Sequence, residues 1–109
     1  MKIGVVGGTG REGRGMAVRW AKAGHDVFIG SRDGARGAQS AQELSSQHGV
    51  TLQGGDNVAA VRHAQLVVLS VPYDAHASTI ESLKADLEGR IILDITVPLA
   101  PPKVRIVHL

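Results

Sequence analysis

Ile3–Gly13 reads Ile-Gly-Val-Val-Gly-Gly-Thr-Gly-Arg-Glu-Gly, which is the most informative segment of the sequence. A short apolar run leads directly into a glycine-rich loop, as it does where a buried β-strand turns into a helix. Glycines allow backbone N–H groups to approach a phosphate closely, and the N-terminus of the next helix favours negative charge. The stretch therefore predicts a strand, a phosphate-binding loop and the first turn of a helix.

The glycines of this loop fit two spacings. Gly8, Gly10 and Gly13 form G-x-G-x-x-G, and counting from Gly7 instead gives G-x-x-G-x-x-G. Either match alone is weak, because glycine-rich turns are common. The following residues strengthen it, since small and apolar side chains recur at helical spacing and Asp26–Gly30 then reads as a second strand. We therefore interpret the loop as a dinucleotide-binding turn, with an ordinary glycine-rich turn as the alternative.

The end of the second strand indicates which dinucleotide binds. In NAD-binding domains an acidic residue about 20 positions past the loop grips the ribose 2′-hydroxyl. This chain has Ser31 and Arg32 there, with Arg36 following on the next helix. A hydroxyl and two guanidinium groups attract a 2′-phosphate, whereas a carboxylate would repel it. We therefore predict selectivity for NADP, with a solvated arginine at the start of a helix as the alternative.

Composition favours one globular domain that binds small molecules. The 109 residues suffice for a single core, and the absence of cysteine excludes disulfides and fits a reducing cytoplasm. No apolar run approaches the roughly 20 residues of a membrane span. We expect no signal peptide, because Met1-Lys2 leads directly into the first strand. The net charge of +2 comes with basic residues gathered in the first third. Phosphates of a dinucleotide explain that cluster better than nucleic acid does.

The rest of the chain alternates between strand and helix patterns. Gln65–Val71 is the strongest strand signal, and its nearly unbroken apolar run predicts a central parallel strand. We expect further strands over Val50–Leu52, Arg90–Ile95 and, as a short one, Val104–Val107, and helices over Ala35–His48, Asn57–His63 and from Asp74 or Ala75 to Gly89, with a turn at Gly54-Gly55. This pattern predicts an α/β fold of Rossmann type, a doubly wound parallel sheet with strand order 3-2-1-4-5.

The strongest strand ends within the segment Ser70-Val71-Pro72-Tyr73. Ligands of this architecture bind outside the carboxyl ends of the strands, where the strand order reverses between strands 1 and 4. We therefore expect these four residues to border the nicotinamide half of the cofactor. Tyr73 would either pack against the nicotinamide or its ribose, or cover the end of the sheet.

No catalytic dyad and no metal site are predicted from the sequence. The histidines are scattered, and none has a carboxylate or a second histidine at ligand spacing on one face. His76 is the histidine nearest the ligand edge, and we expect a helix-surface imidazole, with contact to cofactor or substrate as the alternative. Asp94 lies inside an apolar strand, where a carboxylate needs a partner, so we assign it a structural role.

Four segments together resemble a known family: Gly7–Gly13, Gly24-His25, Gly30-Ser31-Arg32 and Ser70–Tyr73. They are similar to the N-terminal domain of NADPH-dependent reductases of the deazaflavin coenzyme F420. The resemblance implies that Thr9, Gly10, Arg11 and Glu12 wrap the pyrophosphate, that Ser31, Arg32 and Arg36 hold the 2′-phosphate, and that Val71 and Tyr73 flank the nicotinamide. It also implies an oxidoreductase in which hydride passes directly to coenzyme F420 lying near Thr96–Pro98, so that the protein acts by positioning.

The resemblance also bears on domain organisation. Members of the family continue into a second domain that completes the deazaflavin pocket and the dimer. We expect residues 1–109 to form a single NADP-binding domain that lacks this second part. The alternatives are a non-catalytic NADP-binding module, truncated or dependent on a partner, and an imine or metal reductase with the same cofactor domain. We expect small-molecule cofactors as partners, neither nucleic acid nor membrane, and leave a homodimer open.

Overall fold

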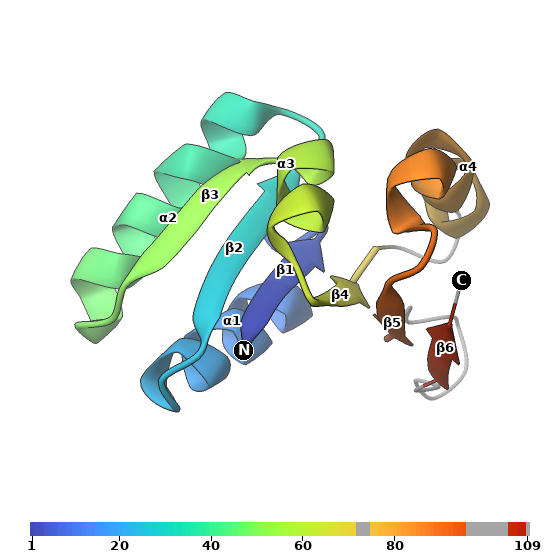
Figure 1. The fold of residues 1–109 in the computed structure, drawn as a ribbon. Helices are drawn as coiled ribbons and strands as arrows, with labels where there is room; N and C mark the ends of the chain where they lie inside the picture. Colours follow the sequence, from blue (N-terminus) through green and yellow to red (C-terminus); the bar gives the residue numbers. More distant parts are fainter. Residues whose placement is uncertain (72–74, 96–104, 109) are drawn as a thin grey trace.

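The computed structural model describes residues 1–71, 75–95 and 105–108, in which strands and helices alternate (Figure 1). The elements are β1 (Lys2–Val6), α1 (Arg11–Lys22), β2 (Asp26–Ser31), α2 (Gly34–His48), β3 (Leu52–Asp56), α3 (Asn57–His63), β4 (Leu66–Leu69), α4 (His76–Leu87), β5 (Ile91–Asp94) and β6 (Arg105–His108). These described strands form one sheet in the order β3-β2-β1-β4-β5-β6. The first five are parallel, which confirms the predicted Rossmann-type order 3-2-1-4-5, and β6 adds an antiparallel edge.

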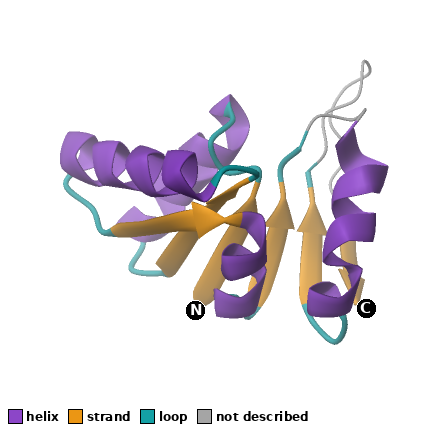
Figure 2. Ribbon diagram, turned by 90° about the horizontal axis from the view of Figure 1, so that it is seen from above, coloured by secondary structure: helices purple, strands orange, loops and turns teal. Residues whose placement is uncertain are grey.

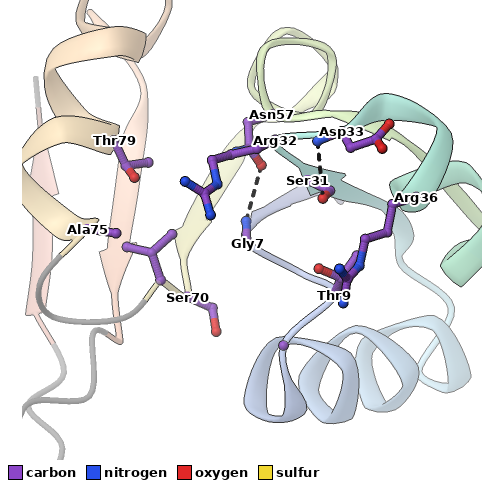
Figure 3. A pocket seen from close by; sticks show the side chains of 12 residues that line it. Gly7, Thr9, Ser31, Arg32, Asp33, Arg36, Asn57, Ser70, Ala75 and Thr79 are labelled. Carbon is purple, nitrogen blue, oxygen red and sulfur yellow. Dashed lines mark hydrogen bonds between the residues drawn. The ribbon is translucent and has the colours of Figure 1, made fainter.

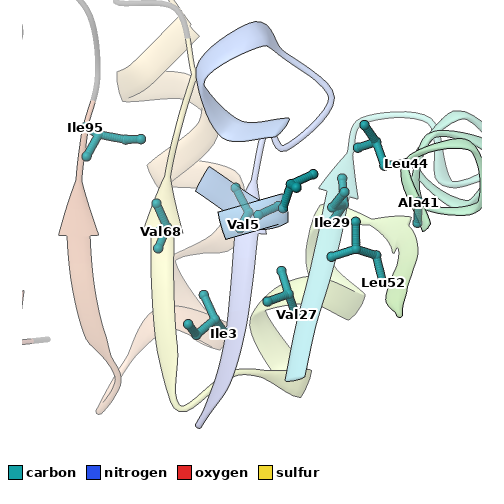
Figure 4. Packing of buried hydrophobic residues seen from close by; sticks show 11 residues of the cluster. Ile3, Val5, Val27, Ile29, Ala41, Leu44, Leu52, Val68 and Ile95 are labelled. Atoms are coloured by element: carbon teal, nitrogen blue, oxygen red, sulfur yellow. The ribbon is translucent and has the colours of Figure 1, made fainter. Parts of the chain in front are cut away.

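Helices cover both faces of the sheet (Figure 2). Val5 and Val6 point to opposite faces of the sheet, because each belongs to a different apolar cluster. Both are fully buried, so each face of β1 is covered. The first cluster joins β1 and β2 to α1 and α2 through residues such as Ala17 and Leu44. Figure 4 shows Val5, Ile29 and Leu44 of this cluster. The second joins β1, β4 and β5 to α3 and α4. Burying each such valine contributes about 1.5–3 kcal/mol, so the apolar runs of the central strands supply the core.

The predicted third strand was wrong in its placement. The expected strand was Val50–Leu52 with a turn at Gly54-Gly55, but β3 runs over Leu52–Asp56 and contains both glycines. A Cβ at Gly54 would collide with the backbone carbonyl of Gly37, and a Cβ at Gly37 would collide with that of Gly55. Helix α2 therefore packs directly on the backbone of β3, and the glycines permit this approach rather than a turn.

Other boundaries differ by a few residues or are confirmed. Asp33 and Asp56 cap α2 and α3, each by accepting a hydrogen bond from a backbone N–H of the first turn, at 2.9 and 2.8 Å. Strand β4 is shorter than Gln65–Val71, and α4 begins at His76. Pro72, Tyr73 and Thr96–Pro98 lie outside the described residues. Among the helices that the structure describes, none is long and apolar enough to cross a membrane.

Candidate functional site

The glycine loop between β1 and α1 is held between the ends of β2 and β4. Gly7 has a φ of 73°, a conformation that favours glycine, and a Cβ there would collide with the carbonyl oxygen of Ser70. The Gly8 N–H donates to the carbonyl oxygen of Gly30 at 2.9 Å. The loop is therefore fixed by backbone contacts to both neighbouring strands, as a preformed phosphate site requires.

The other two motif glycines have different surroundings. A Cβ at Gly13 would lie 3.0 Å from the Gly8 Cα and 3.1 Å from the Ser70 Oγ, so this glycine lets α1 pack closely on the loop. A Cβ at Gly10 would meet only the carbonyl oxygen of Gly7, at an ordinary 3.5 Å. Gly10 is also the N-cap of α1, and no side chain caps the helix there. Within the described protein, the space in front of the α1 N-terminus is left open, as expected where a phosphate approaches.

A cleft of about 400 Å³ opens at the carboxyl ends of the strands (Figure 3). Its lining includes seven of the predicted site residues: Thr9, Gly10, Ser31, Arg32, Arg36, Ser70 and Val71. Gly8 and Gly13 lie inside the loop packing, and Arg11 and Glu12 are exposed on the first turn of α1 beside a neighbouring groove. The seven lining residues are therefore brought to one edge of the sheet, where the strand order reverses between β1 and β4, and the other four do not line this cleft.

The cleft wall at the end of β2 is polar and rich in cations. Ser31 is only 7% exposed, and its Oγ accepts a hydrogen bond from the Asp33 N–H at 3.4 Å. Neither Arg32 nor Arg36 forms an ion pair with any residue that the structure describes. Asp33 also lines the cleft, but one of its carboxylate oxygens is engaged in capping α2. This wall thus carries two guanidinium groups and one carboxylate, which is already engaged in capping α2, and it is therefore suited to an anion.

Asn57 is a site residue that sequence reasoning missed. It lines the cleft, and its Oδ1 accepts a hydrogen bond from the Gly7 N–H at 3.2 Å (Figure 3). It is the first residue of α3, directly after the capping Asp56, so in the sequence it reads as an ordinary helix start. No local signal distinguishes it, because its partner lies fifty residues earlier in the chain.

The interpretation of His76 as a helix-surface imidazole was wrong. His76 Nε2 lies 2.6 Å from Asp94 Oδ2, which joins the first residue of α4 to the last residue of β5. A second histidine–carboxylate pair joins His63 Nε2 and Asp26 Oδ1 at 3.3 Å. Spacing on a single helix face could not reveal either pair, because the fold brings the partners together from different elements. The described residues contain no group of three or more potential metal ligands.

Comparisons with known proteins agree with this arrangement. A family model described as "NADP oxidoreductase coenzyme F420-dependent" matches residues 2–98. The chain is 39% identical to the F420-dependent NADP reductase of Methanothermobacter marburgensis, covering 91% of this chain and 46% of the relative. It is 41% identical to the protein of that name from Methanocaldococcus jannaschii, covering 92% of this chain and 47% of the relative. The chain thus spans about half the length of these curated relatives.

A solved structure shows the same fold at lower sequence identity. The imine reductase BcSIRED from Bacillus cereus superposes with a TM-score of 0.67 at 22% identity. The match covers 87% of this chain and 31% of that protein. At this identity the similarity concerns the fold alone, and it agrees with the doubly wound sheet described above.

Proposed function

Because the chain belongs to the family of coenzyme F420-dependent NADP oxidoreductases, we propose that it is the NADP-binding part of an enzyme that transfers hydride between NADPH and coenzyme F420. The observation that carries the proposal is the cleft, in which the glycine loop, the cationic end of β2 and the end of β4 surround one space. A dinucleotide would use the glycine loop for its pyrophosphate, the end of β2 for its adenosine ribose and the end of β4 for its nicotinamide.

The residues present fit NADP. The open space in front of Gly10 is where the pyrophosphate would lie, with Gly8 and Gly13 allowing the close packing of the loop and with Thr9, Gly10, Arg11 and Glu12 wrapping the phosphates. Ser31, Arg32 and Arg36 would hold the 2′-phosphate through charge-assisted hydrogen bonds. Ser70 and Val71, followed by Pro72 and Tyr73, would border the nicotinamide. When bound, NADPH supplies the hydride, and the task of these residues is to bind and orient it.

We propose that residues 1–109 act as a single NADP-binding domain and that a further domain or a partner chain completes the coenzyme F420 site. The relatives named as reductases are about twice as long as the matched region, so the acceptor half would come from outside it. A second candidate is an NADP-binding module that acts only together with a partner. We further propose a cytoplasmic protein that works with small molecules, in accord with its cysteine-free sequence.

Calorimetric titration with NADPH and NADH tests the cofactor, and a stopped-flow assay with oxidised coenzyme F420 tests the acceptor. We expect NADPH to bind more than about tenfold more tightly than NADH, because each charge-assisted contact to the 2′-phosphate contributes about 1.5–3 kcal/mol. Equal or tighter binding of NADH would contradict the proposed cofactor. We expect the chain alone to bind NADPH without appreciable reduction of coenzyme F420, and a fusion with the second domain of a relative to restore the reduction. Tight NADPH binding with no reduction even by the fusion would favour the partner-dependent module.

A further inference from the structure

The histidine–carboxylate pair of α4 and β5 lies beside the cleft and has no role in the function proposed above. His76 takes the first position of the buried stripe of α4, which continues with Ile80, Leu83 and Leu87. Those three side chains pack in the second apolar cluster, whereas the imidazole meets Asp94 at the end of β5. The pair therefore replaces an apolar contact at the end of this helix–sheet interface that is nearest the cleft.

The first turn of α4 has no side-chain cap. Helices α2 and α3 each begin with an aspartate that accepts a backbone hydrogen bond, but α4 begins after Ala75, which offers none. The Ser78 hydroxyl donates to the Ala75 carbonyl oxygen, a bond within the same turn that does not reach the sheet. The 2.6 Å contact of His76 with Asp94 ties this turn to the sheet.

This turn forms one wall of the cleft. Ala75 precedes His76 and Thr79 follows it by one helical turn, and both line the cleft opposite Ser31 and Arg36 (Figure 3). Asp94 pairs in the sheet with Leu69, the residue before Ser70. The carboxylate is thus fixed to the strand end that borders the cleft, and the imidazole is fixed to the carboxylate. This contact therefore joins the wall to the strand end at the point nearest the cleft.

The burial of the pair supports a positional role. Asp94 is 5% exposed, and the His76 side chain is 20% exposed. Burying a carboxylate is costly unless it is paired, and such pairs add little net stability compared with apolar residues of similar size. Their attested advantage is a defined geometry, because a short hydrogen bond between two restrained side chains permits one arrangement where apolar packing permits several.

We propose that His76 and Asp94 are positioning residues that set the nicotinamide side of the cleft. The inference rests on the proposed binding of NADP. Asp94 orients the imidazole, the imidazole holds the first turn of α4, and that turn places Ala75 and Thr79. The adenosine side of the cleft, built from the glycine loop and the end of β2, does not depend on the pair.

The test compares NADPH with adenosine 2′,5′-bisphosphate, which carries the 2′-phosphate but no nicotinamide. His76→Leu continues the apolar stripe of α4 and removes the hydrogen bond. We expect the affinity of the variant for NADPH to be about three- to tenfold lower than that of the unchanged protein, a loss of up to one hydrogen bond. Its affinity for the bisphosphate should stay within about twofold of the unchanged protein's. His76→Gln keeps an N–H donor for Asp94 and is expected to restore most of the NADPH affinity.

Asp86→Asn is the matched control, because it weakens the 3.0 Å ion pair between Arg62 and Asp86 near the other end of the same helix. It is expected to leave both affinities unchanged. Equal weakening of both ligands by His76→Leu, or no weakening of either, overturns the inference, as does a Gln variant that behaves like Leu. The unchanged protein reports separately on the proposed function: if it binds neither ligand, that proposal fails, and with it this one.

Discussion

The two sides of the cleft are built in different ways. On the adenosine side, the loop after β1 and the turn after β2 carry their polar and glycine residues in short continuous segments of sequence. On the nicotinamide side, the wall is the start of α4, and what places it is a hydrogen bond between residues eighteen positions apart. A ligand-binding surface can therefore be encoded locally on one side and by the tertiary fold on the other. Substitutions on each side of the cleft distinguish local encoding from encoding by the tertiary fold.

The largest expected effect is that of Gly10→Ala on the adenosine side. A methyl group there would occupy the space through which the pyrophosphate approaches the α1 N-terminus. We expect NADPH affinity to fall at least about a hundredfold, the equivalent of one or two lost charge-assisted hydrogen bonds. The fold should persist, because the new Cβ meets the protein only at 3.5 Å. Circular dichroism and calorimetric titration measure the two properties, and undiminished affinity would remove the loop from the site.

Arg32→Ala should have the next largest effect, and a selective one. We expect NADPH binding to weaken by about ten- to a hundredfold and NADH binding to change little, because only the 2′-phosphate uses this side chain. Arg32→Asp should be worse for NADPH through direct repulsion. Arg19→Ala, on the exposed face of α1 and outside the cleft, is the control and should leave both affinities unchanged. If Arg32→Ala weakens the two cofactors equally, the residue is structural rather than selective.

Asn57→Ala should have a smaller effect that does not discriminate between cofactors. It removes the acceptor of the Gly7 N–H and so loosens the loop without touching the 2′-phosphate. We expect a loss of about 1 kcal/mol in the free energy of unfolding and a several-fold weakening of NADPH and NADH alike. Urea unfolding and titration with both cofactors provide the measurement. A change in the NADPH to NADH ratio would show instead that Asn57 takes part in selectivity.

The sequence predicts most of the fold because its signals are local. Apolar runs such as Gln65–Val71 identify the central strands, and the glycine motif followed by Ser31-Arg32 predicts the residues of the proposed adenosine side. The failures share one cause, which is contact between distant segments. In the sequence Gly54-Gly55 is typical of a turn, but in the structure these glycines allow Gly37 of α2 to pack on β3. The pairing of His76 with Asp94 likewise requires α4 to pack on β5. Asn57 is not predicted for the same reason, because its hydrogen-bond partner Gly7 lies fifty residues earlier in the chain.

The smallest effect on binding is expected at Gly15, which lies on α1 only five positions from Gly10. A Cβ at Gly15 would meet nothing within 4 Å, and the residue lies on the exposed surface of the helix. Gly15→Ala should therefore raise the free energy of unfolding by about 0.5–1 kcal/mol, since alanine loses less backbone entropy in a helix. NADPH affinity should stay unchanged. If Gly15→Ala weakened binding as strongly as Gly10→Ala, the loss at Gly10 would reflect a general sensitivity of α1 rather than a phosphate against its N-terminus.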